Sequence, residues 1–210
     1  MAIYELDGVA PRIDPEAFVH PDAVVIGDVT VGAESTVWAG TVLRGDFGTI
    51  TVGARSSFQD GTVVHAGPGF PTIVGDGCVV GHLTHLQGCR LEDDALAGSC
   101  SVVLHHAVIG AGATVAANAV VPNNTVVPPG ALAIGIPARI GEGTLGRALH
   151  QIVGRGVRGE REALPGHAAP VGLTCGQTSY VFFVVPSRPP PWVCAVNTSV
   201  PKGWSPWAAA

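Results

Sequence analysis

Aliphatic residues recur at every sixth position over much of the chain, and this spacing is the strongest pattern in the sequence. Neither the 3.6-residue period of an α-helix nor the two-residue period of a plain β-strand produces it. A hexapeptide repeat does, and such a repeat is typical of a β-helix solenoid. The series is interrupted before residues 52 and 74 and slips by one residue before residue 91; it comprises Val25, Val31, Val37, Leu43, Val52, Phe58, Val64, Val74, Val80, Leu86, Leu91, Ala97, Val103, Ile109, Val115 and Val121.

The repeat predicts an all-β solenoid, built as a single-stranded β-helix with three sides. Each six-residue unit forms one short face and a turn, and three units complete one coil. The repeated aliphatic residue points inwards and stacks on its counterparts in neighbouring coils, which lie about 4.8 Å apart. The composition agrees, because the 29 glycines suit corners with positive φ, and an aromatic content of 6% disfavours a helical bundle.

The repeats set the expected domain boundaries. We predict a β-helix over residues 1–140, with residues 1–20 covering one end, because a solenoid needs capped ends. A short helix is expected over 141–154, where Leu145, Leu149 and Ile152 fall on one helical stripe. Residues 155–210 are predicted to be an irregular tail, since no Asp or Glu follows Glu162 and SRPPPW interrupts any regular element.

Charge and composition exclude several classes of protein. The formal net charge of −5 argues against binding to nucleic acid or to an anionic membrane. The first residues, MAIYELDGVAPRIDP, lack the charged and apolar regions of a secretory leader, so we expect a cytoplasmic protein. The five cysteines include no CxxC pair, which predicts reduced thiols instead of a zinc finger; the first three are expected to fill small positions between coils.

Four motifs carry a resemblance to a known family. They are LRGD at residues 43–46, FQDGTVVH at 58–65, VGHLTHLQGC at 80–89 and VVPPGALAIGIPAR at 126–139. Together they resemble the gamma-class carbonic anhydrases over roughly residues 10–140. The resemblance implies a left-handed β-helix and a homotrimer with metal sites at the subunit boundaries. It also implies Zn²⁺, or Fe²⁺ or Co²⁺, held by three histidines, and reversible hydration of CO2 to bicarbonate by a metal-bound hydroxide.

By match to these motifs, His65 and His82 stand at two of the family's metal-ligand positions. The third position holds Gln87, where the family has a histidine. A neutral glutamine oxygen is a weaker zinc ligand than an imidazole. His85 has the same outward parity as Gln87, so we consider His85 as the third ligand, with Gln87 as the alternative.

The repeat also predicts how these side chains are arranged. His65 follows the inward Val64 and therefore points outwards. Gln87 follows the inward Leu86 and is expected beside His65 on the next coil. His82 belongs to a different face of the prism, and outward directions from two faces diverge. His82 is therefore expected to meet the His65 of an adjacent subunit, as a cyclic oligomer allows.

Further site residues follow from the resemblance. Arg44 and Asp46 match the family's RGD pair, which implies a salt bridge across the subunit boundary. Gln59 would orient metal-bound water or bicarbonate. Asp60 would orient Arg44 or a ligand histidine, although an aspartate before Gly61 also suits an ordinary turn. The catalytic set is thus Gln59, Arg44, Asp46 and Asp60.

Other functions fit the same repeats. One is a hexapeptide-repeat acyltransferase, in which a histidine acts as general base beside acyl-CoA. The other is a non-catalytic, metal-poor trimeric scaffold, which Gln87 favours. Phe47 and the acid-free AGPGFP at residues 66–71 stand where some carbonic anhydrases of this class carry glutamates for proton transfer. His105 and His106 are expected to be polar outward residues.

Overall fold

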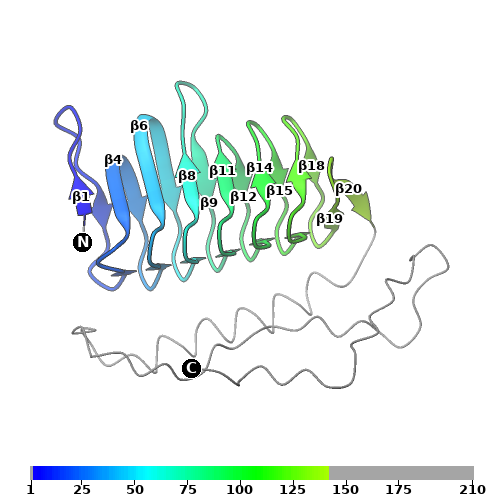
Figure 1. Cartoon of the computed structure of the whole chain (residues 1–210), viewed down its shortest axis with the longest axis horizontal. Helices are drawn as coiled ribbons and strands as arrows, with labels where there is room; N and C mark the ends of the chain where they lie inside the picture. Colours follow the sequence, from blue (N-terminus) through cyan, green and yellow to red (C-terminus); the bar gives the residue numbers. More distant parts are fainter. Residues whose placement is uncertain (1, 142–210) are drawn as a thin grey trace, which may run out of the picture. The chain divides into compact units, whose positions relative to one another are not determined.

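The computed structural model describes residues 2–141 of the 210-residue chain. These residues form short β-strands that wind into a column of stacked coils, running from β1 at one end to β20 at the other (Figure 1). The hexapeptide-repeat β-helix predicted from the sequence is therefore confirmed. The helix expected over 141–154 and the tail expected over 155–210 lie outside the described residues, apart from Gly141, which ends β20.

The strands are arranged as three faces. Two faces share one sheet, because β4 (Val24–Val31) and β6 (Val42–Val52) run continuously from one face onto the next. The first face, called the histidine face below, continues with β8 (Val63–His65), β11 (His85–Gln87), β14 (Val102–Val103) and β17 (Val120–Val121). The second face continues with β9 (Thr72–Val74), β12 (Arg90–Leu91), β15 (Val108–Ile109) and β18 (Val126–Val127).

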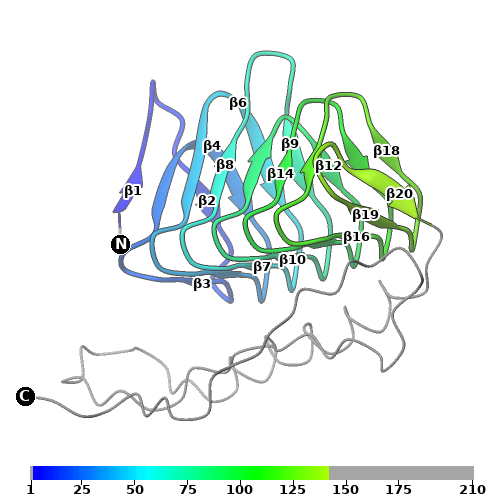
Figure 2. The same cartoon turned by 45° about the vertical axis from the view of Figure 1, so that its right-hand side comes forward.

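The third face is a separate sheet, visible along the lower side of the column in Figure 2. It contains β3 (Phe18–Val19), β5 (Thr36–Val37), β7 (Ser57–Phe58), β10 (Val79–Val80), β13 (Leu96–Ala97), β16 (Thr114–Val115), β19 (Leu132–Ile134) and β20 (Arg139–Gly141). Pairing is parallel throughout the described strands except between β19 and β20. At the N-terminal end, β1 (Ala2–Tyr4) and β2 (Arg12–Ile13) both pair with β4.

The core lies inside the column and consists of the repeated aliphatic residues. All sixteen members of the series predicted to point inwards are at most 2% exposed. The largest of them, Phe58, is fully buried. Burial of apolar surface at roughly 25 cal/mol per Å² is the main term that stabilises such a stack. The single six-residue rule therefore explains both the coil geometry and the position of the core.

The corners require close approach of backbone to backbone. A Cβ atom on Gly53 would lie 2.7 Å from the carbonyl carbon of Gly75 on the next coil, so a side chain there would force the coils apart. At the same corner, Asp76 accepts a hydrogen bond of 2.9 Å from the amide of Ala54. Its other carboxylate oxygen lies 3.1 Å from the guanidinium of Arg55. Asp76 thus ties one coil to the coil before it.

Replacing Asp76 with alanine is expected to lower the free energy of unfolding by about 1 kcal/mol, because the amide of Ala54 loses its acceptor. The ion pair with Arg55 adds little, since both side chains are about half exposed. Urea denaturation of the two proteins measures the difference. Asp76→Asn keeps an acceptor oxygen and should unfold close to the parent protein; an equal loss in both variants would contradict the role of the hydrogen bond.

The described cysteines are free thiols, as predicted. Cys78 and Cys89 are buried, and burial raises the pKa of each thiol to about 12, which keeps them protonated and unreactive. The expectation that Cys100 also fills an interior position is wrong. It lies at a corner, is exposed, and has a φ of 59°. Within residues 2–141, the structure contains no helix that is long and apolar enough to span a membrane.

Candidate functional site

A ladder of outward side chains crosses the histidine face. Arg44 pairs in register with His65, and His65 pairs with Gln87 on the following coil. Neighbouring rungs of a parallel sheet lie about 4.8 Å apart, so these side chains are direct neighbours. Gln87 therefore occupies the place beside His65 that the repeat predicts for it.

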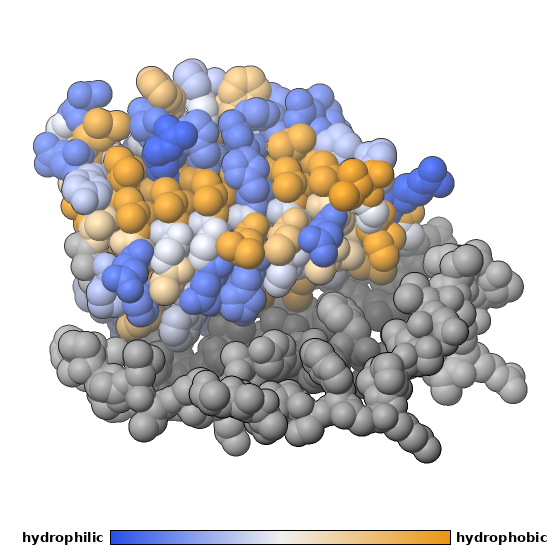
Figure 3. Space-filling model, in the orientation of Figure 1, coloured by the Kyte–Doolittle hydropathy of each residue, from blue (hydrophilic) through white to orange (hydrophobic). Residues whose placement is uncertain are grey.

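A second outward ladder runs beside the first on the same face and is almost entirely apolar. His85 is the one polar residue in the ladder, and its imidazole Nε2 lies 3.0 Å from Oε1 of Gln87. Figure 3 shows apolar side chains gathered in a band along the β-helix. The ladder, in register from coil to coil, is Val24, Val42, Val63, His85, Val102 and Val120.

Asp46 holds His65 from the same edge of the histidine face. Oδ1 of Asp46 lies 2.8 Å from Nε2 of His65, and its Oδ2 is paired with the guanidinium of Arg44. Burial by itself would raise the pKa of Asp46, but the hydrogen bond with His65 and the charge of Arg44 outweigh it, so the pKa lies below its usual value. The carboxylate therefore stays ionised. It contacts Nε2 of His65, so it does not occupy Nδ1. Arg44 and Asp46 pair within one chain here; a salt bridge between chains stays a prediction.

His82 lies at the opposite edge of the histidine face, on the corner that follows β10. Its Nδ1 is 3.0 Å from Oδ2 of Asp60, and both side chains are just over half exposed. Of the two partners expected for Asp60, the structure places it beside the histidine and not beside Arg44. Gln59 precedes Asp60 on the same corner, where its main-chain amide bonds to the carbonyl of Val80.

The two groups of side chains do not meet within one chain. Among residues 2–141, no group of three or more His, Cys, Asp or Glu side chains could hold a metal ion. The chemistry of the donors nevertheless suits zinc. His65 and His82 are each oriented by a carboxylate at one ring nitrogen, which leaves the other nitrogen to bind a metal.

Sequence reasoning missed two contacts of this region. The bond between Asp46 and His65 was detectable, since Asp46 has the same outward parity as Arg44, the partner of His65 in the ladder. The aromatic cluster of Phe70 with His105 and His106 could not be predicted, because the loop of residues 66–71 departs from the repeat. The ring centroids of His105 and His106 lie 5.1 Å and 4.8 Å, respectively, from the ring centroid of Phe70. Both histidines are outward polar residues, as expected.

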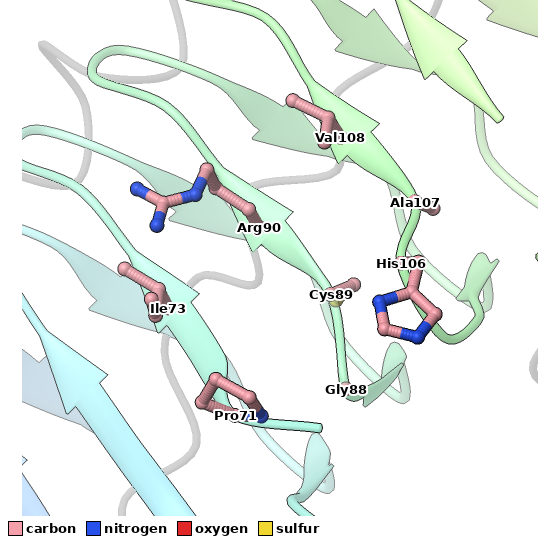
Figure 4. A pocket seen from close by; sticks show the side chains of 8 residues that line it. All are labelled: Pro71, Ile73, Gly88, Cys89, Arg90, His106, Ala107 and Val108. Carbon is pink, nitrogen blue, oxygen red and sulfur yellow. The ribbon is translucent and has the colours of Figure 1, made fainter. Parts of the chain in front are cut away.

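A shallow hollow lies on the second face, close to this cluster. Figure 4 shows that the side chains of Arg90 and His106, the two basic residues in its lining, point in different directions. No polar groups converge there, so this hollow is not the candidate site. Its lining consists of Pro71, Ile73, Gly88, Cys89, Arg90, His106, Ala107 and Val108.

The fold and the outward ladder place the chain among the hexapeptide-repeat β-helix proteins. The carbonic anhydrase of Geobacillus kaustophilus is 41% identical over 138 residues, which cover 66% of this chain and 76% of that protein. A hexapeptide transferase family protein from Anaplasma phagocytophilum superimposes with a TM-score of 0.73 at 32% identity, over 77% of this chain and 97% of that one. No family model matches the sequence.

The chain belongs to the gamma carbonic anhydrase family. Besides the Geobacillus protein, it is similar to the mitochondrial gamma carbonic anhydrase 1 of Arabidopsis thaliana, with 43% identity over 118 residues. That match covers 50% of this chain and 43% of the plant protein, so the chain spans less than half the length of this relative.

Proposed function

We propose that this protein is a metal-dependent hydratase of CO2 whose sites lie between the copies of a homotrimer. The observation that carries the proposal is the pair of carboxylate-held histidines, His65 with Asp46 and His82 with Asp60, at the two edges of one face. Family membership supports the reaction, because relatives at 41% and 43% identity are named carbonic anhydrases. A cytoplasmic location stays a prediction.

The apolar ladder on the histidine face supports assembly through this face. The valines of this ladder stand in register and offer another copy a flat apolar surface. Val63 is 39% exposed, and the other valines of the ladder are half-buried. The basic and acidic groups of the candidate site lie at the margins of the same surface. A cyclic trimer would bring one edge of this face against the opposite edge of the next copy, and so His82 towards His65.

In the assembled site, His65 and His82 would hold the metal, with His85 as third ligand and Gln87 as the alternative. When bound, zinc supplies a Lewis acid that lowers the pKa of water to about 7. We propose zinc first, with Fe²⁺ or Co²⁺ also compatible with imidazole ligands. We expect weaker hydration than from three in-register histidines, because Gln87 occupies the third position.

The remaining residues have roles that follow from their contacts. Asp46 and Asp60 orient the two imidazoles, and Arg44 keeps Asp46 ionised. Gln59, the residue before Asp60, would orient water or bicarbonate through its side-chain amide. Hydration of CO2 releases one proton, and residues 66–71 offer no acid to accept it. External buffer is the acceptor we expect, and the half-buried His85 could accept the proton only where Gln87 is the third ligand.

The proposal is tested on the purified full-length chain by metal analysis, sedimentation and stopped-flow CO2 hydration. We expect a particle of three times 21.3 kDa, about one zinc per chain, and hydration that chelation removes and zinc restores. Cobalt substitution gives a visible spectrum that reports the ligands without reference to activity. A trimer that neither binds metal nor hydrates CO2 would be the non-catalytic scaffold and would overturn the proposal.

An acyltransferase is the second candidate, because a structural relative at 32% identity is titled a hexapeptide transferase family protein. In that case the pair of His65 and Asp46 would act as an oriented general base. Consumption of acetyl-CoA in the presence of amine and hydroxyl acceptors distinguishes the two functions. Turnover of acetyl-CoA that survives chelation, without CO2 hydration, would favour the transferase.

A further inference from the structure

Leu83 has a backbone conformation that leucine rarely adopts. Its φ is 57°, in the left-handed region where a Cβ atom collides with the chain. Eight other non-glycine residues among those described have positive φ, and none of them is aliphatic. They are Asp7, Glu34, Arg55, Asp94, Cys100, His106, Asn118 and Asn124.

The position of Leu83 in its corner makes the choice of leucine more unusual. The preceding coils place Gly40 and Gly61 at this corner, and the following coil places Cys100 there, all with positive φ. The amide of Leu83 donates to the carbonyl of Asp60 at 2.9 Å, which any residue except proline would also do. The leucine side chain is 63% exposed, so in a single chain it gains little from burial. Neither the fold of one coil nor the core requires a leucine here.

Leu83 lies directly beside the candidate site. It follows His82, and its side chain extends over the corner residue after Asp60, since a Cβ on Gly61 would meet Cδ2 of Leu83 at 2.6 Å. The corner that presents the His82–Asp60 pair therefore presents an exposed aliphatic group with it. Strain of this kind is retained where the surroundings compensate for it, and it concentrates at functional sites.

We infer that Leu83 is an apolar wall of the shared metal site, covered by the neighbouring copy of the chain in the trimer. This inference rests on the proposed function, and it names a residue that determines specificity. A small apolar molecule such as CO2 is favoured against an aliphatic wall, whereas bicarbonate and other anions are not. Burial against the next copy offsets the strain that a single chain carries.

The test uses Leu83→Asn in the full-length protein, because asparagine tolerates positive φ and removes the apolar surface. At protein concentrations low enough that both proteins are single chains, we expect the variant to unfold at the same or higher urea concentration than the parent protein, because asparagine relieves the strain. In the presence of a chelator, so that metal contributes nothing to assembly, trimers should dissociate at a concentration at least about tenfold higher. With zinc, KM for CO2 should rise about tenfold while kcat stays within about twofold, since the lost contact is to the substrate.

Cys100→Asn is the matched control, because it introduces the same residue at the same corner, one coil along, without removing an aliphatic side chain. It should leave assembly and KM unchanged. A Leu83→Asn variant whose single chain unfolds more readily than the single chain of the parent protein, or one with normal assembly, would overturn the inference; so would normal KM in an active variant. If the parent protein hydrates no CO2, the proposed function fails, and the sedimentation result alone still decides whether Leu83 is covered.

Discussion

Replacing His82 with alanine is expected to abolish zinc binding and CO2 hydration, although His82 makes no contact with His65 within one chain. The reason is that the proposed site takes His65 and the third ligand from one copy and His82 from the next, and the two neutral ligands that remain hold zinc poorly. Replacing His65 with alanine should have the same effect. Zinc content after dialysis and the cobalt spectrum measure the loss directly, and stopped-flow hydration measures its consequence. His106→Ala, a change of an exposed histidine on another corner, should retain both properties.

Mixing the two inactive variants provides a sharper test of the shared site. When His65→Ala and His82→Ala chains are unfolded, combined in equal amounts and refolded, some boundaries join an intact His65 to an intact His82. Random assembly of a three-fold ring restores about a quarter of the sites, each with normal zinc affinity. Recovery of metal binding on mixing is the expected result. If mixed trimers form without recovering any zinc, then the two histidines do not share a site and the proposed arrangement is wrong.

The fold could be predicted almost completely from the sequence, because one rule governs it. Each inward residue of the series, from Val25 to Val121, is buried as the six-residue period requires. The same rule fixed the direction of His65 and its neighbour Gln87, since a position just after an inward residue must point outwards. Periodicity therefore also placed the candidate ligands of the histidine face on their ladder.

The contacts of individual side chains could not be derived in this way. Asp60 could pair with Arg44 or with a histidine, depending on side-chain rotamers. Only the structure shows that it pairs with His82. The strain at Leu83 arises because its corner requires a positive φ. The preceding coils have glycine at this corner, so the sequence alone does not show that a leucine adopts the same conformation. The interaction of His85 with Gln87 joins two residues of one strand, which the repeat treats as belonging to separate ladders. The candidate site therefore departs from the repeat at the corner of His82 and Leu83 and within β11.

Replacing Gln87 with histidine is expected to tighten zinc binding by about a hundredfold or more. Residues that only hydrogen-bond to a metal ligand already change metal affinity by up to about a hundredfold, and a direct ligand should do at least as much. The change puts a third imidazole in register with His65, one rung away. His85 lies two residues earlier on the same strand, a displacement of about 6.6 Å, and its Nε2 is engaged by the amide of Gln87. The stronger ligand should also raise CO2 hydration. Competition with a zinc chelator measures the affinity, and stopped-flow hydration measures the rate.

His85→Ala in both backgrounds shows which residue completes the site. With Gln87 present, loss of His85 should weaken zinc binding, because His85 is then the third imidazole. With histidine at position 87, loss of His85 should have little effect, since the in-register residue has replaced it. A Gln87→His variant with unchanged zinc affinity would mean that this rung does not face the metal. The ladder through Arg44, His65 and Gln87 would then be an ordinary surface of the trimer boundary, and the binding site would have to lie elsewhere.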